Sequence, residues 1–360
     1  MRVLQLIDTL NAGGAERMAV NLANELQKMY GQSFLCATRS EGILKESIAT
    51  KVKYLFLQRQ KTIDLQAIKL LVGFVRKEKI EIIHAHSTSF FMACLVKLWC
   101  WKVKIVWHDH YGNSEFLQHR PKKTLKLASL MFSQIISVNS NLERWAKKEL
   151  NCSEVKVLPN FIASNIGLKE TTLKGEYGIK LVCLANLRPQ KNHLFLIQVF
   201  ESLVKEFPNT SLHLVGKDFN DDTSERIKKL IADLQLEQQV FLYGEKKDVG
   251  FILSQANIGV LGSKSEGLPL CVLEYGLAKL PVVSTDVGDI KKVINHEQNG
   301  LLVPSEHNEL FCEKLVSLIQ NENERLRLGN ALFATVERNY SFSSIKKDIN
   351  SIYTKVLHES

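Results

Sequence analysis

The seven cysteines of this 360-residue chain fit neither a disulfide framework nor a zinc site. Their number is odd, they are scattered from Cys36 to Cys312, and no two of them are spaced as Cys-x-x-Cys. The first residues run straight into an apolar segment, without the basic region and cleavage site of a secretion signal. We therefore expect a protein of the cytoplasm.

The chain also lacks an apolar run long enough to cross a bilayer. Its longest apolar stretch, residues 90–107, is interrupted by Lys97, Lys102 and Lys104 and is shorter than the roughly 20 residues that a membrane span needs. We expect no transmembrane helix. A chain of this length with 45% hydrophobic residues can instead bury two separate cores, so we expect two domains.

Acidic residues are scarce in the first half of the chain. Residues 1–165 contain 24 Lys and Arg but only 13 Asp and Glu, whereas residues 166–360 contain 23 against 25. The net charge of +9 therefore comes from the first half. This asymmetry favours a polyanionic partner for that half, either an anionic membrane surface or nucleic acid.

Apolar runs of strand length alternate with segments of helical period along the whole chain. This alternation is typical of parallel sheets covered by helices on both faces, so the predicted fold class is α/β. In the first half we expect strands at residues 3–7, 34–38, 52–57, 80–84, 104–107, 135–138 and 155–158. In the second half we expect them at residues 180–184, 211–215, 240–242, 258–261, 282–284 and 301–303.

A change of pattern marks the expected boundary between the domains. Residues 159–178 are mostly polar, contain three glycines and show no clear period, which is typical of a linker. We expect one doubly wound, Rossmann-like domain at residues 1–165 and a second at residues 166–340. A helix at residues 341–360 is expected to pack back on the first domain.

The most informative segment follows the strand expected at residues 258–261 and leads into a helix. At such a corner of a doubly wound fold, free backbone amides and the positive helix end attract phosphate, and Gly267 and Leu268 supply those amides. Glu266 and Glu274 lie eight residues apart, in the loop and in the helix. Carboxylates accept hydrogen bonds from vicinal hydroxyls, so the two can bind different sugar or ribose groups of one ligand.

Two cations precede the first helix of the second half. Arg188 and Lys191 lie three residues apart where the strand at residues 180–184 passes into this helix. Cations at a helix N-terminus oppose the helix dipole, so they favour an anion between them, such as a diphosphate.

A glycine pair follows the first strand of the chain. Gly13 and Gly14 allow a backbone to approach a ligand closely, and Glu16 stands in the first turn of the following helix. Taken alone, such a pair is often only a turn between a strand and a helix.

Four histidines stand at the ends of two strands in the first half. His84 and His86 end one strand, and His108 and His110 end the next, so all four are expected at one sheet edge. A metal site formed by these histidines and Asp109 is one interpretation, and hydrogen-bonded edge histidines are another.

A basic segment follows these histidines. Arg120, Lys122, Lys123 and Lys126 alternate with apolar residues, and after Pro121 the pattern predicts a basic amphipathic helix. Such a helix can lie on an anionic bilayer, or it can be an ordinary domain helix with a solvated basic rim. The segment lacks interleaved aromatic residues for base stacking, so nucleic acid is not expected as a partner.

Taken together, these motifs resemble glycosyltransferase family 4. Glu266 and Glu274 match the two glutamates of its Glu-x7-Glu motif. Further matches, in the same order, are Gly13-Gly14-Ala15-Glu16, Ile83-His-Ala-His86, Pro159-Asn160 and Leu187-Arg-Pro-Gln-Lys-Asn192. Phe161 departs from the pattern, since many relatives have glycine after Pro-Asn. The resemblance implies the GT-B fold, in which two Rossmann-like domains face each other across a cleft.

The resemblance also implies a function for these residues. The expected reaction is transfer of a sugar from a nucleoside diphosphate sugar, UDP-sugar favoured over GDP-sugar, to a hydroxyl acceptor with retention of configuration. The basic first half and the cytoplasmic features, rather than the resemblance, indicate that the acceptor is a lipid-linked or polysaccharide precursor. Donor-binding residues would be Gly14, Arg188, Lys191, Gly267, Leu268 and Glu274. His110 and Glu266 would be catalytic, with His108 as the alternative to His110 at the donor sugar. The acceptor side would include Gly13, Glu16, His86 and His108.

No cofactor or metal is expected. The chain has no Asp-x-Asp pair, the usual metal-bridging element of the other main glycosyltransferase fold, and the cations at residues 188 and 191 would replace the metal. Two alternatives stay open. A sugar-nucleotide epimerase can have the same architecture, and a binding module can keep the fold without catalysis.

Overall fold

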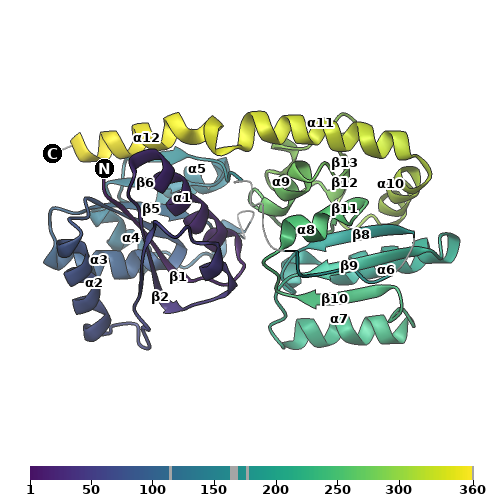
Figure 1. Cartoon of the computed structure of the whole chain (residues 1–360), viewed down its shortest axis with the longest axis horizontal. Helices are drawn as coiled ribbons and strands as arrows, with labels where there is room; N and C mark the ends of the chain where they lie inside the picture. The colour runs from purple at the N-terminus through teal and green to yellow at the C-terminus, as the bar shows by residue number, and fades with distance from the viewer. Residues whose placement is uncertain (113–115, 163–168, 176–177, 359–360) are drawn as a thin grey trace. The chain divides into compact units, whose positions relative to one another are not determined.

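The computed structural model describes residues 1–112, 116–162, 169–175 and 178–358. The chain forms two compact units, one made of Met1–Phe161 with Phe342–Ser360 and the other of Ile162–Ser341 (Figure 1). Each unit contains one parallel sheet with helices packed against it, so the predicted α/β class is confirmed. The predicted boundary between residues 165 and 166 lies outside the described residues.

The first unit is built on a seven-stranded parallel sheet with the strand order β3-β2-β1-β4-β5-β6-β7. Helices α2, α3, α4 and α5 bury apolar residues against one face, and α1 packs on the other. The strands are β1 (Val3–Thr9), β2 (Phe34–Ser40), β3 (Lys53–Phe56), β4 (Ile82–His86), β5 (Lys104–Asp109), β6 (Gln134–Ser137) and β7 (Val155–Val157). The helices are α1 (Gly14–Tyr30), α2 (Leu65–Lys77), α3 (Phe90–Trp99), α4 (Lys123–Ala128), α5 (Ser140–Glu149) and α12 (Phe342–His358).

The C-terminal helix α12 belongs to the first unit although it follows the second in sequence. Its Tyr353 is fully buried and contacts Gln5 of the interior strand β1. Asn350 of α12 accepts a hydrogen bond of 2.8 Å from Tyr30 at the end of α1. The chain end thus contributes a side chain to the interior of the first sheet.

The second unit has a six-stranded parallel sheet with the strand order β10-β9-β8-β11-β12-β13. The strands are β8 (Ile179–Leu184), β9 (Thr210–Val215), β10 (Val240–Gly244), β11 (Ile258–Leu261), β12 (Val282–Thr285) and β13 (Leu301–Val303). The helices are α6 (His193–Glu206), α7 (Asp222–Asp233), α8 (Val249–Ser254), α9 (Leu270–Leu277), α10 (Asn308–Gln320) and α11 (Glu322–Tyr340).

Several helices begin where the sequence supplies a capping side chain. Asp64, Asn139, Asp221 and Asn321 each accept a hydrogen bond from a backbone amide in the first turn of α2, α5, α7 and α11. Such a bond satisfies one of the amides that a helix start leaves without a partner. Short 3-10 turns complete the described structure: η1 (Ile43–Ser47), η2 (Ser87–Ser89), η3 (Leu117–His119), η4 (Ser129–Met131), η5 (Pro189–Lys191) and η6 (Ile290–Lys292).

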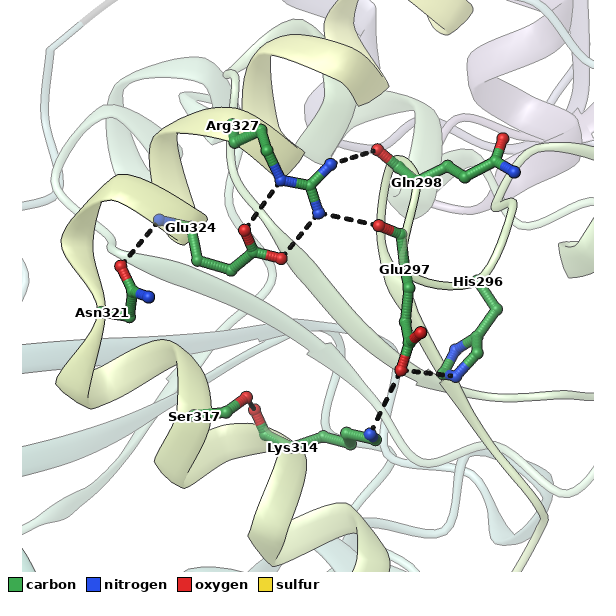
Figure 2. A network of polar contacts seen from close by, with 8 residues as sticks. All are labelled: His296, Glu297, Gln298, Lys314, Ser317, Asn321, Glu324 and Arg327. Carbon is green, nitrogen blue, oxygen red and sulfur yellow. Dashed lines mark hydrogen bonds and ion pairs between the residues drawn. The ribbon is translucent and has the colours of Figure 1, made fainter.

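A polar network holds the junction of α10 and α11 on the loop before β13 (Figure 2). Arg327 pairs with Glu324 and donates to the backbone oxygens of Glu297 and Gln298. Lys314 of α10 reaches the Glu297 carboxylate at 3.5 Å. These exposed contacts fix the start of α11, whose later turns pack on α9.

In the described part of the chain, no helix combines the length and the apolar character that a bilayer crossing requires. The predicted cytoplasmic location stays a prediction.

Candidate functional site

The loop between β11 and α9 holds the first candidate site, in the second unit. Glu266 lies in this loop and its side chain is only 7% exposed. One oxygen of its carboxylate, Oε1, accepts a hydrogen bond of 2.6 Å from Ser263 Oγ and lies 2.5 Å from Lys191 Nζ. A buried carboxylate requires such partners, because burial of an unpaired charge is very unfavourable.

The loop is held on both sides by neighbouring backbone. Thr285 Oγ1 donates to the Ser263 carbonyl at 2.7 Å, and the Asp289 amide donates to the Gly267 carbonyl at 3.1 Å. Gly288 has a φ of 59° and packs so closely that a Cβ atom would lie 2.0 Å from the Glu266 carbonyl oxygen. Only glycine fits this position, and the close packing fixes Glu266.

Lys191 and Arg188 lie at the start of α6 but in different environments. Burial disfavours the charged form of Lys191, but the adjacent Glu266 charge outweighs it, so the pKa of Lys191 is raised. Arg188 is exposed, and its guanidinium carbon lies 4.8 Å from the centre of the Phe219 ring. Lys191 thus reaches into the loop that carries Glu266, while Arg188 stands at the solvent side.

Glu274 lies half-buried on α9, next to a tyrosine that fixes this helix. The buried Tyr275 hydroxyl accepts a hydrogen bond of 2.8 Å from the Leu184 amide and lies 3.2 Å from the Val182 carbonyl oxygen. Gly259 of β11 makes room for the Tyr275 ring, since a Cβ atom there would lie 2.7 Å from it. Phosphate binding by the amides of Gly267 and Leu268, and diol binding by Glu274, stay predictions.

The second candidate site is the histidine group of the first unit. His84 and His86 of β4 and His108 of β5 are fully buried, and His110 directly follows β5. The rings of His108 and His110 have centres 4.0 Å apart, and those of His84 and His86 have centres 4.6 Å apart. The prediction that the four gather at one sheet edge agrees with this geometry.

Two chains of hydrogen bonds start from the amide of Gln5 and pass through the four histidines. Gln5 Oε1 lies 2.8 Å from His86 Nε2, and His86 Nδ1 lies 3.0 Å from His110 Nε2. Gln5 Nε2 donates to the Tyr353 hydroxyl at 3.4 Å. That hydroxyl lies 2.6 Å from His84 Nδ1, and His84 Nε2 lies 3.2 Å from His108 Nδ1.

These contacts fix where the protons lie, because burial keeps the rings neutral. Burial lowers the pKa of His84 and of His110 to about 3, and the pKa values of His86 and His108 are lowered as well. A carbonyl oxygen can only accept, so His86 Nε2 carries hydrogen and His86 Nδ1 accepts from His110 Nε2. His110 is then left with a bare Nδ1, a hydrogen-bond acceptor.

In the second series of hydrogen bonds, which runs from Gln5 through Tyr353 to His84 and His108, the donors point away from Gln5. The Tyr353 hydroxyl donates to His84 Nδ1, and His84 Nε2 donates to His108 Nδ1. His108 Nε2 then carries a hydrogen, and it has no partner among the described residues. The group therefore has one bare acceptor nitrogen, on His110, and one buried donor without a described partner, on His108.

A metal ion is the alternative occupant of this group. One nitrogen each of His84, His86 and His108 lies within 4.8 Å of the others. The hydrogen bonds above use five of the six nitrogens of these three rings. The rings thus satisfy one another.

The glycine pair lies at the start of α1. Gly13 precedes the helix, and a Cβ atom there would lie 2.2 Å from Glu16 Oε2. Glu16 Oε1 accepts a hydrogen bond of 3.0 Å from Thr9 Oγ1, at the end of β1. That carboxylate is the flexible end of the Glu16 side chain and can move away, so packing alone does not require glycine at Gly13. The binding roles predicted for Gly13, Gly14 and Glu16 stay predictions.

Arg120 corrects one prediction about the basic segment. Its side chain is 7% exposed and binds Asp109 through two hydrogen bonds of 2.7 and 2.8 Å. The guanidinium also lies between aromatic rings, 4.4 Å from the centre of Tyr111 and 4.3 Å from that of Trp145. Arg120 is therefore not a membrane-surface cation but fixes the chain beside His108 and His110.

Lys122, Lys123 and Lys126 are exposed, and Lys122 pairs with Glu149 at 2.5 Å. The helix expected after Pro121 is the single short α4 followed by η4.

Sequence reasoning missed Gln5 and Tyr353, and it did not predict the bond from Ser263 to Glu266 or the pairing of Asp109 with Arg120. Gln5 had a signal, since it is a polar residue inside an apolar strand. Tyr353 had none, because it lies 269 positions from His84 and only the packing of α12 brings it there.

The two halves of the chain each match a family of known proteins. Residues 12–165 match the family described as Glycosyltransferase Family 4, and residues 168–333 match Glycosyl transferases group 1. The N-acetyl-alpha-D-glucosaminyl L-malate synthase of Bacillus anthracis is 24% identical over 82% of this chain and 80% of its own length. The UDP-Gal:alpha-D-GlcNAc-diphosphoundecaprenol alpha-1,3-galactosyltransferase of Escherichia coli is 24% identical over 72% of this chain and 71% of its own.

The fold is also shared with solved structures. The Anabaena protein Alr3699/HepE, solved in complex with UDP and glucose, superposes with a TM-score of 0.81 at 16% identity. The match covers 99% of this chain and all of that one. Fold and matches together define a glycosyltransferase of the GT-B fold. The chain belongs to the group 1 glycosyltransferases, and its first half matches Glycosyltransferase Family 4. The predicted resemblance is therefore confirmed.

Proposed function

We propose that the protein transfers a sugar from a UDP-sugar to a hydroxyl group of a lipid-linked or polysaccharide precursor, with retention of configuration and without a metal ion. The observation that supports the proposal most is the ion pair between Lys191, which precedes α6, and the buried Glu266 in the loop before α9. The pair places one cation for phosphate beside one carboxylate for hydroxyls.

On donor binding, the diphosphate would draw the ammonium of Lys191 away from the carboxylate. Lys191 would neutralise charge on the leaving phosphate, and the exposed Arg188 would approach it from the solvent side. Glu266, still held by Ser263, would then accept hydrogen bonds from sugar hydroxyls. Charge stabilisation of the leaving group by two cations is the reason to expect metal-independent transfer.

In the first unit, the bare Nδ1 of His110 would accept a hydrogen bond from a hydroxyl of the transferred sugar. His108, whose Nε2 hydrogen is buried, lies next to His110. Both rings are neutral at physiological pH because burial lowers their pKa values, so they provide direction without charge. A neutral, hydrogen-bonding wall suits a sugar, whose hydroxyls are themselves neutral.

Named relatives support the identity of the substrates. The Escherichia coli relative uses UDP-Gal and a diphosphoundecaprenol acceptor according to its name. A Campylobacter jejuni relative, 22% identical over 92% of both chains, is named as a transferase acting on a diNAcBac-PP-undecaprenol glycan. These names favour a uridine nucleotide and an acceptor built on a lipid diphosphate.

A transfer assay tests the proposal. The full-length protein is incubated with labelled UDP-sugars, an undecaprenol-diphosphate glycan acceptor and EDTA, and the product is examined by NMR. We expect labelled lipid product with the anomeric configuration of the donor. Product of inverted configuration, or activity that EDTA abolishes, would contradict the corresponding part of the proposal.

The same assay separates the alternatives. An epimerase would convert the UDP-sugar to its epimer in the absence of any acceptor. A binding module would bind UDP without consuming UDP-sugar under any acceptor tested.

A further inference from the structure

Five large apolar side chains stand exposed in two neighbouring segments of the first unit. Leu98, Trp99 and Trp101 are 69, 64 and 76% exposed. Leu127 and Leu130 are 70 and 66% exposed. We call these five residues the apolar patch. Scattered single apolar residues on a surface are ordinary, but a group containing two tryptophans marks an interaction site.

The two segments lie at the same edge of the sheet. Leu98 and Trp99 end α3 and Trp101 follows, just before β5, whereas Leu127 of α4 and Leu130 of η4 come just before β6. Because β5 and β6 are neighbouring parallel strands, the segments that enter them meet at one edge. The helices also contact each other, since Cys94 Sγ of α3 lies 3.9 Å from the Ala128 carbonyl oxygen of α4 (Figure 1).

The patch is not an incomplete core. Helix α3 buries Met92, Ala93, Cys94 and Val96 against the sheet, and α4 buries Leu125 and Ala128. The patch residues therefore belong to the outward faces of helices whose inward faces are already filled. The apolar patch also lies at the sheet edge opposite the histidine group. The other ends of β4 and β5 carry His84, His86, His108 and His110.

Exposed cations accompany the patch, and the acid described beside them, Glu149, pairs with Lys122 and also lies near Lys126. Lys102, Lys123 and Lys126 are exposed, and Lys102 Nζ lies 5.4 Å from the centre of the Trp101 ring. Between residues 90 and 142 the sequence has only two acidic residues, Asp109 and Glu115. Asp109 is buried against Arg120, so it does not offset these charges at the surface.

We propose that the apolar patch inserts into the interface of an anionic lipid bilayer, with Lys102, Lys123 and Lys126 contacting lipid phosphates. Tryptophan and leucine favour the boundary between headgroups and acyl chains, and each cation near an anionic surface adds to the attraction. This docking does not depend on the transfer reaction. If the protein does not bind membranes, the proposed sugar transfer still stands. If it does not transfer sugar, the proposed membrane docking still stands.

The tryptophans allow a direct test on the full-length protein. The chain has four, of which Trp99 and Trp101 lie in the patch, while Trp107 is buried and Trp145 is half-buried. On mixing with phosphatidylglycerol vesicles we expect a blue-shifted emission, quenching by brominated lipid, and co-sedimentation that weakens at high salt. Vesicles of phosphatidylcholine alone should bind at least ~10-fold less protein, because the lysines have no anionic partner there.

Variants identify the surface. Trp99→Ser with Trp101→Ser, and separately Leu127→Ser with Leu130→Ser, should each lower binding to phosphatidylglycerol vesicles by at least ~10-fold. The matched control is Leu326→Ser on α11 of the second unit, whose side chain is 57% exposed and which should bind vesicles like the wild type. Unchanged UDP binding in every variant shows that the fold is retained.

Three outcomes would overturn the inference. One is equal vesicle binding by the wild type and both patch variants. Another is no binding of the wild type to any vesicle. The third is a wild-type dimer that the patch variants convert to a monomer without any vesicle binding, which would assign the patch to a second copy of this chain.

Discussion

The two candidate sites use opposite electrostatics. In the second unit, Lys191 and Glu266 form a buried ion pair, and the pKa of Lys191 is raised by its partner. In the first unit, four adjacent histidines are kept neutral by burial and are ordered by Gln5 and Tyr353 through hydrogen bonds.

The two sites therefore suit different kinds of ligand group. A diphosphate is charged and requires a cation that can leave its protein partner. A sugar is neutral and requires donors and acceptors in fixed positions. The comparison therefore predicts that changes of charge affect the second unit most, and changes of proton position the first.

The largest effect is expected for Lys191→Ala. The change removes the cation proposed for the leaving phosphate and leaves the buried Glu266 carboxylate without its ion pair. We expect kcat/KM for the UDP-sugar to fall about 100- to 1000-fold, as for loss of a group that stabilises developing charge. Lys264→Ala is the matched control, because Lys264 lies in the same loop as Glu266 but pairs with the exposed Glu306, and it should retain wild-type kinetics.

Glu266→Gln sharpens the comparison by removing charge while keeping shape. The amide can still accept from Ser263, but it no longer holds Lys191 as an ion pair. We expect kcat to fall about 100-fold while UDP binds as tightly as to the wild type or more tightly. Equal losses of kcat and UDP affinity would show that Glu266 only supports the fold of the loop.

Acid should destabilise the first unit through its histidines. Their pKa values in the folded chain lie far below the ordinary value, with about 3 for His84 and His110, so the unfolded chain takes up protons first as the pH falls. Stability is then complete above about pH 6.5 and declines below it, by up to roughly 1.4 kcal/mol per histidine and pH unit. Urea unfolding followed by tryptophan fluorescence reports this unit alone, because all four tryptophans lie in it.

A variant isolates the histidine contribution to this acid sensitivity. His84→Gln removes one of the buried rings, so one proton fewer is taken up on unfolding. The slope of the unfolding free energy against pH, between about pH 5 and 6, should decrease by the contribution of one histidine. An unchanged slope would show that His84 does not titrate on unfolding.

The smallest effect is expected for Gln5→Leu, which tests proton position without changing charge. Without the Gln5 carbonyl, His86 Nε2 loses its acceptor and the bare nitrogen of His110 is no longer fixed. We expect kcat to fall about 5- to 10-fold, close to the value of one hydrogen bond. Nitrogen NMR of the histidine rings should show His110 as a single tautomer in the wild type and as a mixture in the variant.

Gln134→Leu is the control for this change. Gln134 is also a buried glutamine on the first sheet, but it bonds to the Ile135 carbonyl. It should leave both kcat and the His110 tautomer unchanged.

Local patterns in the sequence predicted the sheets well. All thirteen expected strands are present, because apolar runs bounded by turn residues determine them locally. Helix α11 was not predicted, since its first turns are mostly charged and Gly329 interrupts its apolar pattern. That glycine serves packing, because a Cβ atom there would lie 2.0 Å from the Lys279 carbonyl oxygen.

The sites were only partly predictable, because several of their contacts join residues that lie far apart in the sequence. The sequence motif indicated Lys191, Glu266 and His110, but no local pattern indicates that Arg120 is buried against Asp109 or that Tyr353 reaches His84. Such contacts depend on tertiary packing.

The most direct test of the account is calorimetric titration of UDP into the full-length protein in the presence of EDTA. If Lys191 binds the diphosphate, the wild type and Lys264→Ala should bind UDP equally well, whereas Lys191→Ala should lose at least ~10-fold in affinity. Equal affinity of the wild type and Lys191→Ala, or binding that requires a divalent ion, would contradict the central role given to the cation beside Glu266.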